Sequence, residues 1–264
     1  MYAIFSIDDI PKKIKSAVKG IDDIHYPRQG HASQLGIIQT QAGTFALKHT
    51  HGADGCASLK REVYVLSLLQ NQSNLPVPRV YAFINDEQAN ETWALLTFIK
   101  GKTVRAALSD CCSLEERNII VTQFGAALAD IHATPCPLEL KEQVGPWLNR
   151  MLDQAEINLK NGMSDGSESL LSNLQPHKPI FETEKLIHGD FTIDNVLIHE
   201  GNVTGIIDWG GGALGDARYD LALAIRPKPP IVTKADAEAF YRGYGKRKLT
   251  DEEFRYFVDL YEFF

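Results

Sequence analysis

Residues 187–198 read IHGDFTIDNVLI, and this stretch carries the strongest signal in the sequence. It places an acid, Asp190, and an amide, Asn195, on either side of four intervening residues. The apolar residues that follow predict a short strand, and a second short strand is predicted at 203–208. This second strand ends in another acid, Asp208, thirteen positions after Asn195. Three polar side chains therefore stand at fixed spacings beside two short strands.

Phosphoryl transfer explains why these three side chains occur together. The spacing of Asp190 and Asn195 is that of the catalytic loop H-R-D-x-x-x-x-N of protein kinases, and the segment DWG at 208–210 stands where those enzymes have D-F-G. In that reaction a carboxylate accepts the proton of the attacking hydroxyl, while an amide and a second carboxylate hold magnesium on the phosphates. We therefore predict Asp190 as the catalytic base and Asn195 and Asp208 as ligands of Mg²⁺.

Three further segments make the pattern specific, because they read LPVPRV at 75–80, IHATP at 131–135 and GDARYDLA at 215–222. Together with the two motifs above, they make the sequence resemble the aminoglycoside phosphotransferase family, relatives of choline kinase that share the protein-kinase-like fold. The resemblance extends from about Gly30 to the end of the printed sequence. It implies a two-lobed α+β fold.

The hydrophobic pattern agrees with two lobes. A strand-rich segment of about a hundred residues comes before a helix-rich one, so two lobes with a cleft between them are expected. We place the N-lobe, an antiparallel nucleotide-binding sheet with one main helix, at 1–99. The C-lobe, with the catalytic loop, the metal site and the substrate-binding helices, is placed at 100–264. The predicted strands are 35–40, 43–48, 79–84, 92–98, 195–199 and 203–208, and the predicted helices are 6–19, 58–70, 114–133, 147–160, 233–244 and 251–264.

The resemblance also implies a nucleotide site in the N-lobe, for ATP with GTP as the alternative. Lys48 ends a predicted strand, where kinases of this fold keep the lysine that holds the α- and β-phosphates. Glu62 follows fourteen residues later on a predicted helix and is the expected ion-pair partner of Lys48. Ser33 ends the short segment that would cover the phosphates, and the backbones of Thr97 and Ile99 would bind the edge of adenine.

A glycine cluster at 210–215, GGGALG, fits the pattern G-x-G-x-x-G of dinucleotide-binding turns. That interpretation requires a following helix and a second parallel strand, but prolines at 227, 229 and 230 interrupt the segment first. A phosphate-binding loop requires Lys and then Ser or Thr, where this chain has Asp216 and Ala217. We therefore expect the glycines to shape a mobile loop beside Asp208.

Two features favour a small-molecule kinase over a protein kinase. Gly189 replaces the arginine of H-R-D, which in protein kinases can pair with a phosphorylated activation loop. Only eleven residues separate Asp208 from Asp220, and no A-P-E segment follows. The alternative from another class is a catalytically silent nucleotide-binding protein. Such a protein would be expected to lack the base or a metal ligand, whereas this sequence has both.

The remaining polar residues near these motifs are expected to be structural. His188 would brace the catalytic loop, and Asp194 would be solvated or cap the loop. Asp216 and Asp220 would hold the lobe together through hydrogen bonds. His132 would cap the end of its helix.

The last predicted helix gives the clue to the acceptor. Residues 251–264 contain five acids and one arginine, a net charge of −4. Glu262 and the carboxylate of Phe264 resemble the ending of some aminoglycoside kinases, where acidic groups face a cationic antibiotic. We therefore expect these two residues to bind a cationic acceptor, with antibiotic resistance as the corresponding role. An apolar stripe is expected to fix this segment, with the members Phe254, Phe257, Val258, Tyr261 and Phe264.

Two alternatives to this acceptor stay open. The last helix could simply cover the lobe with a solvated acidic face. The family that the sequence resembles also includes kinases for macrolides, choline, homoserine, methylthioribose and fructosamines, so another small molecule could be the acceptor.

Composition excludes several other classes of protein. Of the 264 residues, 44% are hydrophobic and 23% are charged, which is an ordinary globular composition. The 34 acids against 27 Lys and Arg give a net charge of −7, which argues against a nucleic-acid partner and favours cationic small molecules.

No run approaches the roughly 18 apolar residues of a membrane span, and the acidic start does not resemble a secretory signal. The four cysteines form no C-x-x-C pair, so we expect reduced thiols in a cytoplasmic monomer or dimer.

Overall fold

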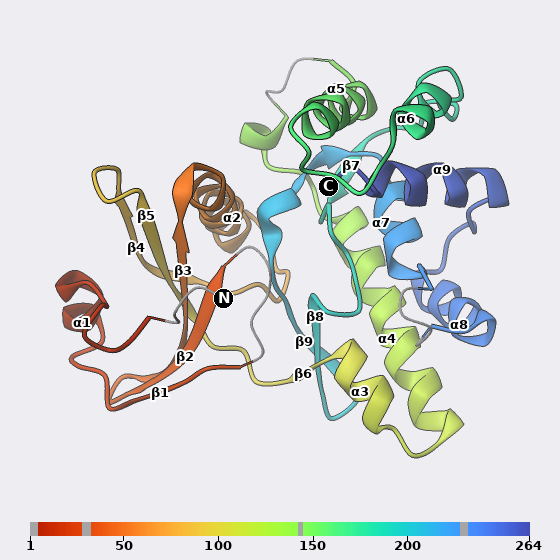
Figure 1. Cartoon of the computed structure of the whole chain (residues 1–264). Helices are drawn as coiled ribbons and strands as arrows, with labels where there is room; N and C mark the ends of the chain where they lie inside the picture. Colours follow the sequence, from red (N-terminus) through yellow and green to blue (C-terminus); the bar gives the residue numbers. More distant parts are fainter. Residues whose placement is uncertain (1–4, 28–32, 142–144, 228–231) are drawn as a thin grey trace. The chain divides into compact units, whose positions relative to one another are not determined.

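The computed structural model describes residues 5–27, 33–141, 145–227 and 232–264 (Figure 1). By its internal contacts the chain forms two compact units, one of Met1–Lys100 with Gly205–Gly210 and one of Gly101–Thr204 with Gly211–Phe264. Within the described ranges, no helix combines the length and the apolar character needed to cross a lipid bilayer.

The first unit is built on a five-stranded antiparallel sheet with the strand order β1-β2-β3-β5-β4. Its strands are β1 Asp23–His25, β2 Gln34–Thr40, β3 Gly43–His51, β4 Val80–Asp86 and β5 Glu91–Thr97. A two-residue turn at 41–42 joins β2 to β3, and Gly43 follows it with a φ of 123°, which L side chains rarely adopt. The four strands predicted for this region are confirmed.

Side chains alternate along β3, so this strand has two chemically different faces. Phe45 and Leu47 point to one face, where they join a core that also contains Phe5, Ile10, Ile14, Val18, Trp93 and Leu95. Lys48 points to the other face, toward Glu62 on the helix α2 Gly52–Gln72. The lysine and this apolar core therefore lie on opposite faces of the sheet.

The first helix is shorter than predicted. Helical periodicity predicted a helix at 6–19, whereas α1 spans only Lys12–Ala17. Pro11 has no backbone N–H and disfavours helical backbone in the residue before it. Before Pro11 the chain forms turns, and the Asp9 carboxylate accepts hydrogen bonds from the backbone N–H and the hydroxyl of Ser6. Local hydrogen bonds thus replace the predicted first turns of the helix.

The second unit is mainly helical. Two of its helices, α4 (Leu114–Ala133) and α8 (Lys234–Tyr244), pack closely against each other. A Cβ on Gly125 of α4 would lie 2.0 Å from the carbonyl oxygen of Phe240. A Cβ on Gly243 of α8 would lie 1.9 Å from the carbonyl oxygen of Thr122. Only glycine permits this approach of two helices. The predicted bounds of α4 and α5 are confirmed. The helices are α3 Val104–Asp110, α4 Leu114–Ala133, α5 Trp147–Lys160, α6 Glu168–Leu174, α7 Ala217–Ala224, α8 Lys234–Tyr244 and α9 Asp251–Tyr261.

Short strands of the second unit flank the predicted catalytic loop. β7 Lys185–Ile187 precedes the loop and pairs with β10 Ala213–Gly215, while β8 Val196–His199 follows it. β8 lies between β6 Lys102–Thr103 and β9 Asn202–Ile206 in a three-stranded sheet.

The expectation of a mobile loop at 210–215 was wrong. Residues 209–211 form a 3₁₀ turn, and residues 213–215 form β10. A Cβ on Gly215 would lie 2.5 Å from the terminal methyl group of Ile187 and 2.9 Å from the ring of Trp147, so a side chain there would require these buried residues to shift. Gly215 therefore serves close packing.

The end of the last helix also differs from the prediction. α9 begins at a capping box formed by Thr250 and Glu253, and its buried face joins the core of the second unit. Phe263 is fully buried, whereas the side chain of Phe264 is 44% exposed. The prediction that Phe264 belongs to the apolar stripe was therefore wrong. Phe264 follows the end of α9 at Tyr261, so helical spacing no longer applies to it.

Candidate active site

The predicted catalytic loop is fixed through its backbone. The fully buried carboxylate of Asp220, on α7, accepts hydrogen bonds from the N–H groups of His188 at 2.7 Å and Gly189 at 2.8 Å. Nδ1 of His188 accepts a hydrogen bond from the N–H of Asp190 at 3.2 Å. The structural roles expected of Asp220 and His188 are thus confirmed.

A second layer of polar contacts holds Asp220 itself. Nε2 of His132, in the last turn of α4, lies 3.4 Å from Oδ2 of Asp220, and Nδ1 of His132 lies 2.9 Å from the hydroxyl of Tyr244 on α8. All three residues are buried. His132 was expected only to cap its helix. It therefore also connects Asp220, which holds the catalytic loop, to α4 and α8.

Asp190 is held by two hydrogen bonds to its carboxylate. Oδ2 accepts a hydrogen bond from Nδ2 of Asn195 at 2.7 Å, and Nδ2 also donates to the backbone carbonyl of Asp190 at 2.8 Å. Oδ1 of Asp190 accepts a hydrogen bond from the hydroxyl of Tyr261 at 3.0 Å. The structure thus brings Asp190 and Asn195 together, and it adds a residue that the sequence interpretation had assigned only to the apolar stripe.

Tyr261 is suited to remain a neutral hydrogen-bond donor. Burial and the neighbouring charge of Asp190 raise the pKa of its hydroxyl well above the ordinary tyrosine value.

The ring of Tyr261 lies 4.8 Å from the guanidinium of Arg226, which forms an ion pair with Glu262. Glu262, predicted to bind the acceptor, therefore has a cationic partner within the chain.

Two glycines bring the catalytic loop against the segment that precedes β10. Gly189 has a φ of 81°, and a Cβ at this position would lie 2.3 Å from the carbonyl oxygen of Gly211. No L side chain fits there without moving the backbone. This close approach explains why glycine replaces the arginine of the H-R-D pattern.

The first unit contains the predicted pair of Lys48 and Glu62 together with Asp208. Nζ of Lys48 lies 2.7 and 2.9 Å from the two carboxylate oxygens of Glu62, and it also forms an ion pair with Asp208. Burial alone would lower the pKa of Lys48, but the two carboxylates outweigh it and raise this pKa above its ordinary value. The expected pair of Lys48 and Glu62 is formed, and Lys48 stays cationic.

Asp208 has a backbone conformation that is uncommon for a residue with a side chain. Its φ is 62°, and such left-handed conformations cost roughly 1–3 kcal/mol at a non-glycine residue. The next residue, Trp209, is fully buried, and its indole N–H donates to the carbonyl of Ile206 at 3.0 Å. The Asp208 side chain remains 46% exposed. The buried tryptophan thus anchors a strained residue whose carboxylate reaches solvent.

The residues predicted to contact the rest of the nucleotide lie near the start of β2 and the end of β5. Ser33 is half-buried just before β2. The rest of the predicted phosphate-covering segment, Gly30, His31 and Ala32, lies outside the described residues. The N–H of Thr97 donates to the carbonyl of Arg79 at 2.9 Å. A contact with adenine at this residue would therefore have to use another group of Thr97. The side chain of Ile99 packs against Gly205.

Comparison with known sequences gives relatives of several kinds. The chain is 28% identical over 193 residues to a probable acyl-CoA dehydrogenase, IBR3, of Arabidopsis thaliana, covering 67% of this chain but 23% of that protein. It is 27% identical over 198 residues to an aminoglycoside 3'-phosphotransferase of Escherichia coli, covering 70% of each. It is 30% identical over 197 residues to a homoserine kinase of Neisseria meningitidis, covering 69% of this chain and 59% of the kinase. The chain thus spans less than a quarter of the first of these relatives.

Solved structures confirm the predicted α+β fold. An aminoglycoside-3'-phosphotransferase of type VIII matches with a TM-score of 0.79 at 22% identity, over 98% of this chain and 99% of that one. A thermostable mutant of the aminoglycoside phosphotransferase APH(4)-Ia, in a ternary complex with ADP and hygromycin B, matches with a TM-score of 0.68 at 18% identity, over 94% and 87% of the two chains. At these identities the likeness concerns the fold.

The sequence profile of the phosphotransferase enzyme family matches residues 28–257, which is most of the chain. This match includes Lys48, Asp190, Asn195 and Asp208. It confirms the family resemblance that the motifs indicated. The chain therefore belongs to the phosphotransferase enzyme family.

Proposed function

We propose that this protein transfers the γ-phosphoryl group of ATP, or alternatively of GTP, to a hydroxyl of a small molecule. The observation that carries the proposal is the environment of Asp190. Its carboxylate lies between the hydroxyl of Tyr261 and the amide of Asn195, in a loop whose backbone is fixed by Asp220. Phosphoryl transfer depends mainly on positioning and electrostatics, so a carboxylate held in one orientation suits it.

The group around Lys48 supports a nucleotide as the phosphoryl donor. A lysine held by a glutamate on the following helix is the arrangement that binds the α- and β-phosphates in kinases of this fold. Lys48 is 8% exposed and keeps its charge through Glu62 and Asp208. The ADP in the APH(4)-Ia complex is consistent with this donor.

Asn195 and Asp208 are proposed as the ligands of Mg²⁺. Both provide oxygen atoms, which this hard cation prefers, and the Asp208 carboxylate already accepts a cationic partner in Lys48. Nδ2 of Asn195 donates both to the backbone carbonyl and to the carboxylate of Asp190, so Oδ1 is the atom suited to the metal. When bound, Mg²⁺ would neutralise charge on the phosphates.

The chain's own residues then have distinct tasks in the reaction. Lys48 binds the donor, and Asp190 orients the acceptor hydroxyl and takes its proton as the new P–O bond forms. Tyr261 and Asn195 keep the carboxylate in place. The bond from the γ-phosphorus to the bridging oxygen breaks, and the nucleoside diphosphate leaves.

An aminoglycoside is the first candidate for the acceptor. Two comparisons support this class, the phosphotransferase of Escherichia coli and the type VIII structure. The acidic α9 segment agrees with a cationic acceptor. The ion pair of Glu262 with Arg226 reduces the attraction of Glu262 for a cationic acceptor. Homoserine is the second candidate, because the chain is also similar to the homoserine kinase of Neisseria meningitidis.

A matched pair of variants tests the proposed function. Aminoglycosides, macrolides, choline, homoserine and sugar metabolites are each incubated with the protein and MgATP or MgGTP, and nucleotide consumption is measured. Asp190→Asn should reduce acceptor-dependent turnover about 100-fold or more, with nucleotide affinity little changed. Asp194→Asn is the control, because this carboxylate is in the same loop but pairs with Arg105. Equal turnover in the two variants, or no turnover of any acceptor by the wild type, would contradict the proposal.

A further inference from the structure

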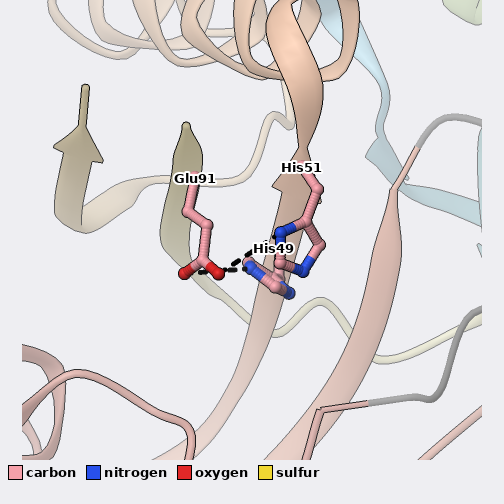
Figure 2. A group of neighbouring side chains, drawn as sticks. All are labelled: His49, His51 and Glu91. Carbon is pink, nitrogen blue, oxygen red and sulfur yellow. Dashed lines mark ion pairs between the residues drawn. The ribbon is translucent and has the colours of Figure 1, made fainter. Parts of the chain in front are cut away.

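A second group of polar side chains lies at one end of the sheet in the first unit. His49 and His51 belong to β3, and Glu91 begins β5 (Figure 2). The strand register places His51 directly opposite Glu91. His49 and His51 are two residues apart, so both point to the face of the sheet opposite Lys48. This group is therefore separate from the proposed nucleotide site.

The three side chains converge on a small volume. Nδ1 of His51 lies 3.3 Å from Oε1 of Glu91, and Nε2 of His49 lies 3.7 Å from Oε2 of Glu91. One nitrogen from each ring and one carboxylate oxygen all lie within 4.8 Å of one another. Figure 2 shows the carboxylate of Glu91 pointing toward both rings.

His49 carries a buried atom whose hydrogen bonding is not satisfied. Its side chain is 3% exposed, and Nε2 has no hydrogen-bond partner among the described residues. Nδ1 lies 3.4 Å from the side-chain oxygen of Gln34, and this oxygen can only accept. The proton of the neutral ring is therefore expected on Nδ1, which leaves a lone pair on Nε2. That lone pair faces the carboxylate of Glu91, so two acceptors face each other where a cation would satisfy both.

Neighbouring residues fix the orientation of these groups. The ring of His49 stacks on Trp93 with 3.7 Å between the ring centroids, and Phe5 packs edge-on against it at 5.7 Å. The indole N–H of Trp93 donates to Oε2 of Glu91 at 3.4 Å. Metal ligands in proteins are commonly held in this way by a hydrogen bond from a second residue. The side chains of His51 and Glu91 are 52% and 32% exposed, which gives an ion access from solvent.

We propose that His49, His51 and Glu91 bind a transition-metal ion of the zinc class. Two imidazole nitrogens and one carboxylate oxygen suit Zn²⁺, whereas Mg²⁺ and Ca²⁺ prefer ligand sets made of oxygen. Ligands about 2.0–2.1 Å from a tetrahedral zinc ion lie roughly 3.3–3.4 Å from each other. The three donor atoms, one from each residue, now lie within 4.8 Å of one another, and the partly exposed side chains of His51 and Glu91 can turn to bring them to this spacing. Water would occupy the fourth position.

This site would link the end of β3 to the start of β5. Lys48 precedes His49 on β3, and α2, which carries Glu62, begins directly after His51. A bound ion would therefore stabilise the strand end next to the Lys48–Glu62 pair. Because an ion that binds only the folded state stabilises it, Zn²⁺ should raise the melting temperature of the whole chain.

The test is a calorimetric titration of the chelator-treated whole chain with Zn²⁺ alone. We expect one ion per chain at this site in the wild type. Glu91→Gln and His51→Ala should each weaken binding about 10-fold or more, and each should reduce the rise in melting temperature at the same Zn²⁺ concentration. Because both side chains are partly exposed, the variants are expected to fold, which circular dichroism of the zinc-free proteins checks. If one variant does not fold, the other decides.

A double variant serves as the matched control, because adjacent thiols can also bind zinc. Cys111→Ser with Cys112→Ser removes the one pair of neighbouring cysteines and should leave the zinc affinity unchanged. Co²⁺ bound in place of zinc should show no thiolate charge-transfer absorption. Wild-type affinity in Glu91→Gln and His51→Ala would overturn the proposal, as would loss of binding in the double cysteine variant. None of these outcomes depends on phosphoryl transfer, so they leave the proposed function to its own test.

Discussion

Replacing Tyr261 by Phe tests whether the contact between α9 and the catalytic loop supports catalysis. The change removes only the hydroxyl, which donates to Oδ1 of Asp190 at 3.0 Å. A hydrogen bond to a charged group contributes about 1.5–3 kcal/mol, and about 1.4 kcal/mol corresponds to a tenfold change in rate. Asn195 would still hold Oδ2, so the lower end applies, and kcat should fall about 10-fold.

The assay is steady-state turnover of the best acceptor with MgATP, together with the melting temperature and the nucleotide affinity. The nucleotide affinity should change little, and the melting temperature should fall only by the contribution of the lost hydrogen bond, because the ring of Tyr261 keeps its packing against Arg226. Tyr256→Phe is the matched control on the same helix, since the buried hydroxyl of Tyr256 has no hydrogen-bond partner among the described residues. Wild-type kcat in Tyr261→Phe, or an equal decrease in both variants, would refute the positioning role of Tyr261.

Three further predictions concern the loop and the last helix. Asp220→Asn replaces one of two acceptors of backbone N–H groups, so denaturant titration should show a free energy of unfolding lower by about 1–3 kcal/mol, with reduced turnover. Gly189→Ala puts a Cβ against the carbonyl of Gly211 at a positive φ, and thermal unfolding should show a loss of more than about 1 kcal/mol. Hydrogen bonds from Arg247 lower the pKa of Glu253 to about 2, below its unfolded value, so this stabilisation is complete above about pH 4.3 and is lost as the pH falls toward 2. Melting curves of Glu253→Gln over this pH range should lack that part of the decrease, and an identical pH dependence would contradict the assignment.

Local signals explain why some elements could be predicted from the sequence. α4 has a long periodic apolar pattern, and the side chain of its N-cap, Ser113, accepts a hydrogen bond from the N–H of Glu116. Asp190 and Asn195 could be identified because the spacing between them is itself part of the chemistry. Such features depend on residues close together in the chain.

Other elements left no local signal. Seven of the eight residues of α7 are buried, so the sequence shows no alternation of apolar and polar faces from which this helix could be recognised. β10 has only three residues, and its pairing with β7 depends on the folded chain. Tyr261 reaches Asp190 across 71 positions of sequence, and the group of His49, His51 and Glu91 forms only when β3 pairs with β5.

Mass spectrometry of the reaction products tests the central claim most directly. The wild-type chain, MgATP and each candidate acceptor are incubated together, and both the acceptor and the nucleotide are analysed. We predict an acceptor heavier by one phosphoryl group and an equal amount of ADP, with both products nearly absent from Asp190→Asn. ADP formed with inorganic phosphate alone, or the same yield of phosphorylated acceptor from Asp190→Asn, would contradict the assignment of Asp190 as the base of a small-molecule kinase.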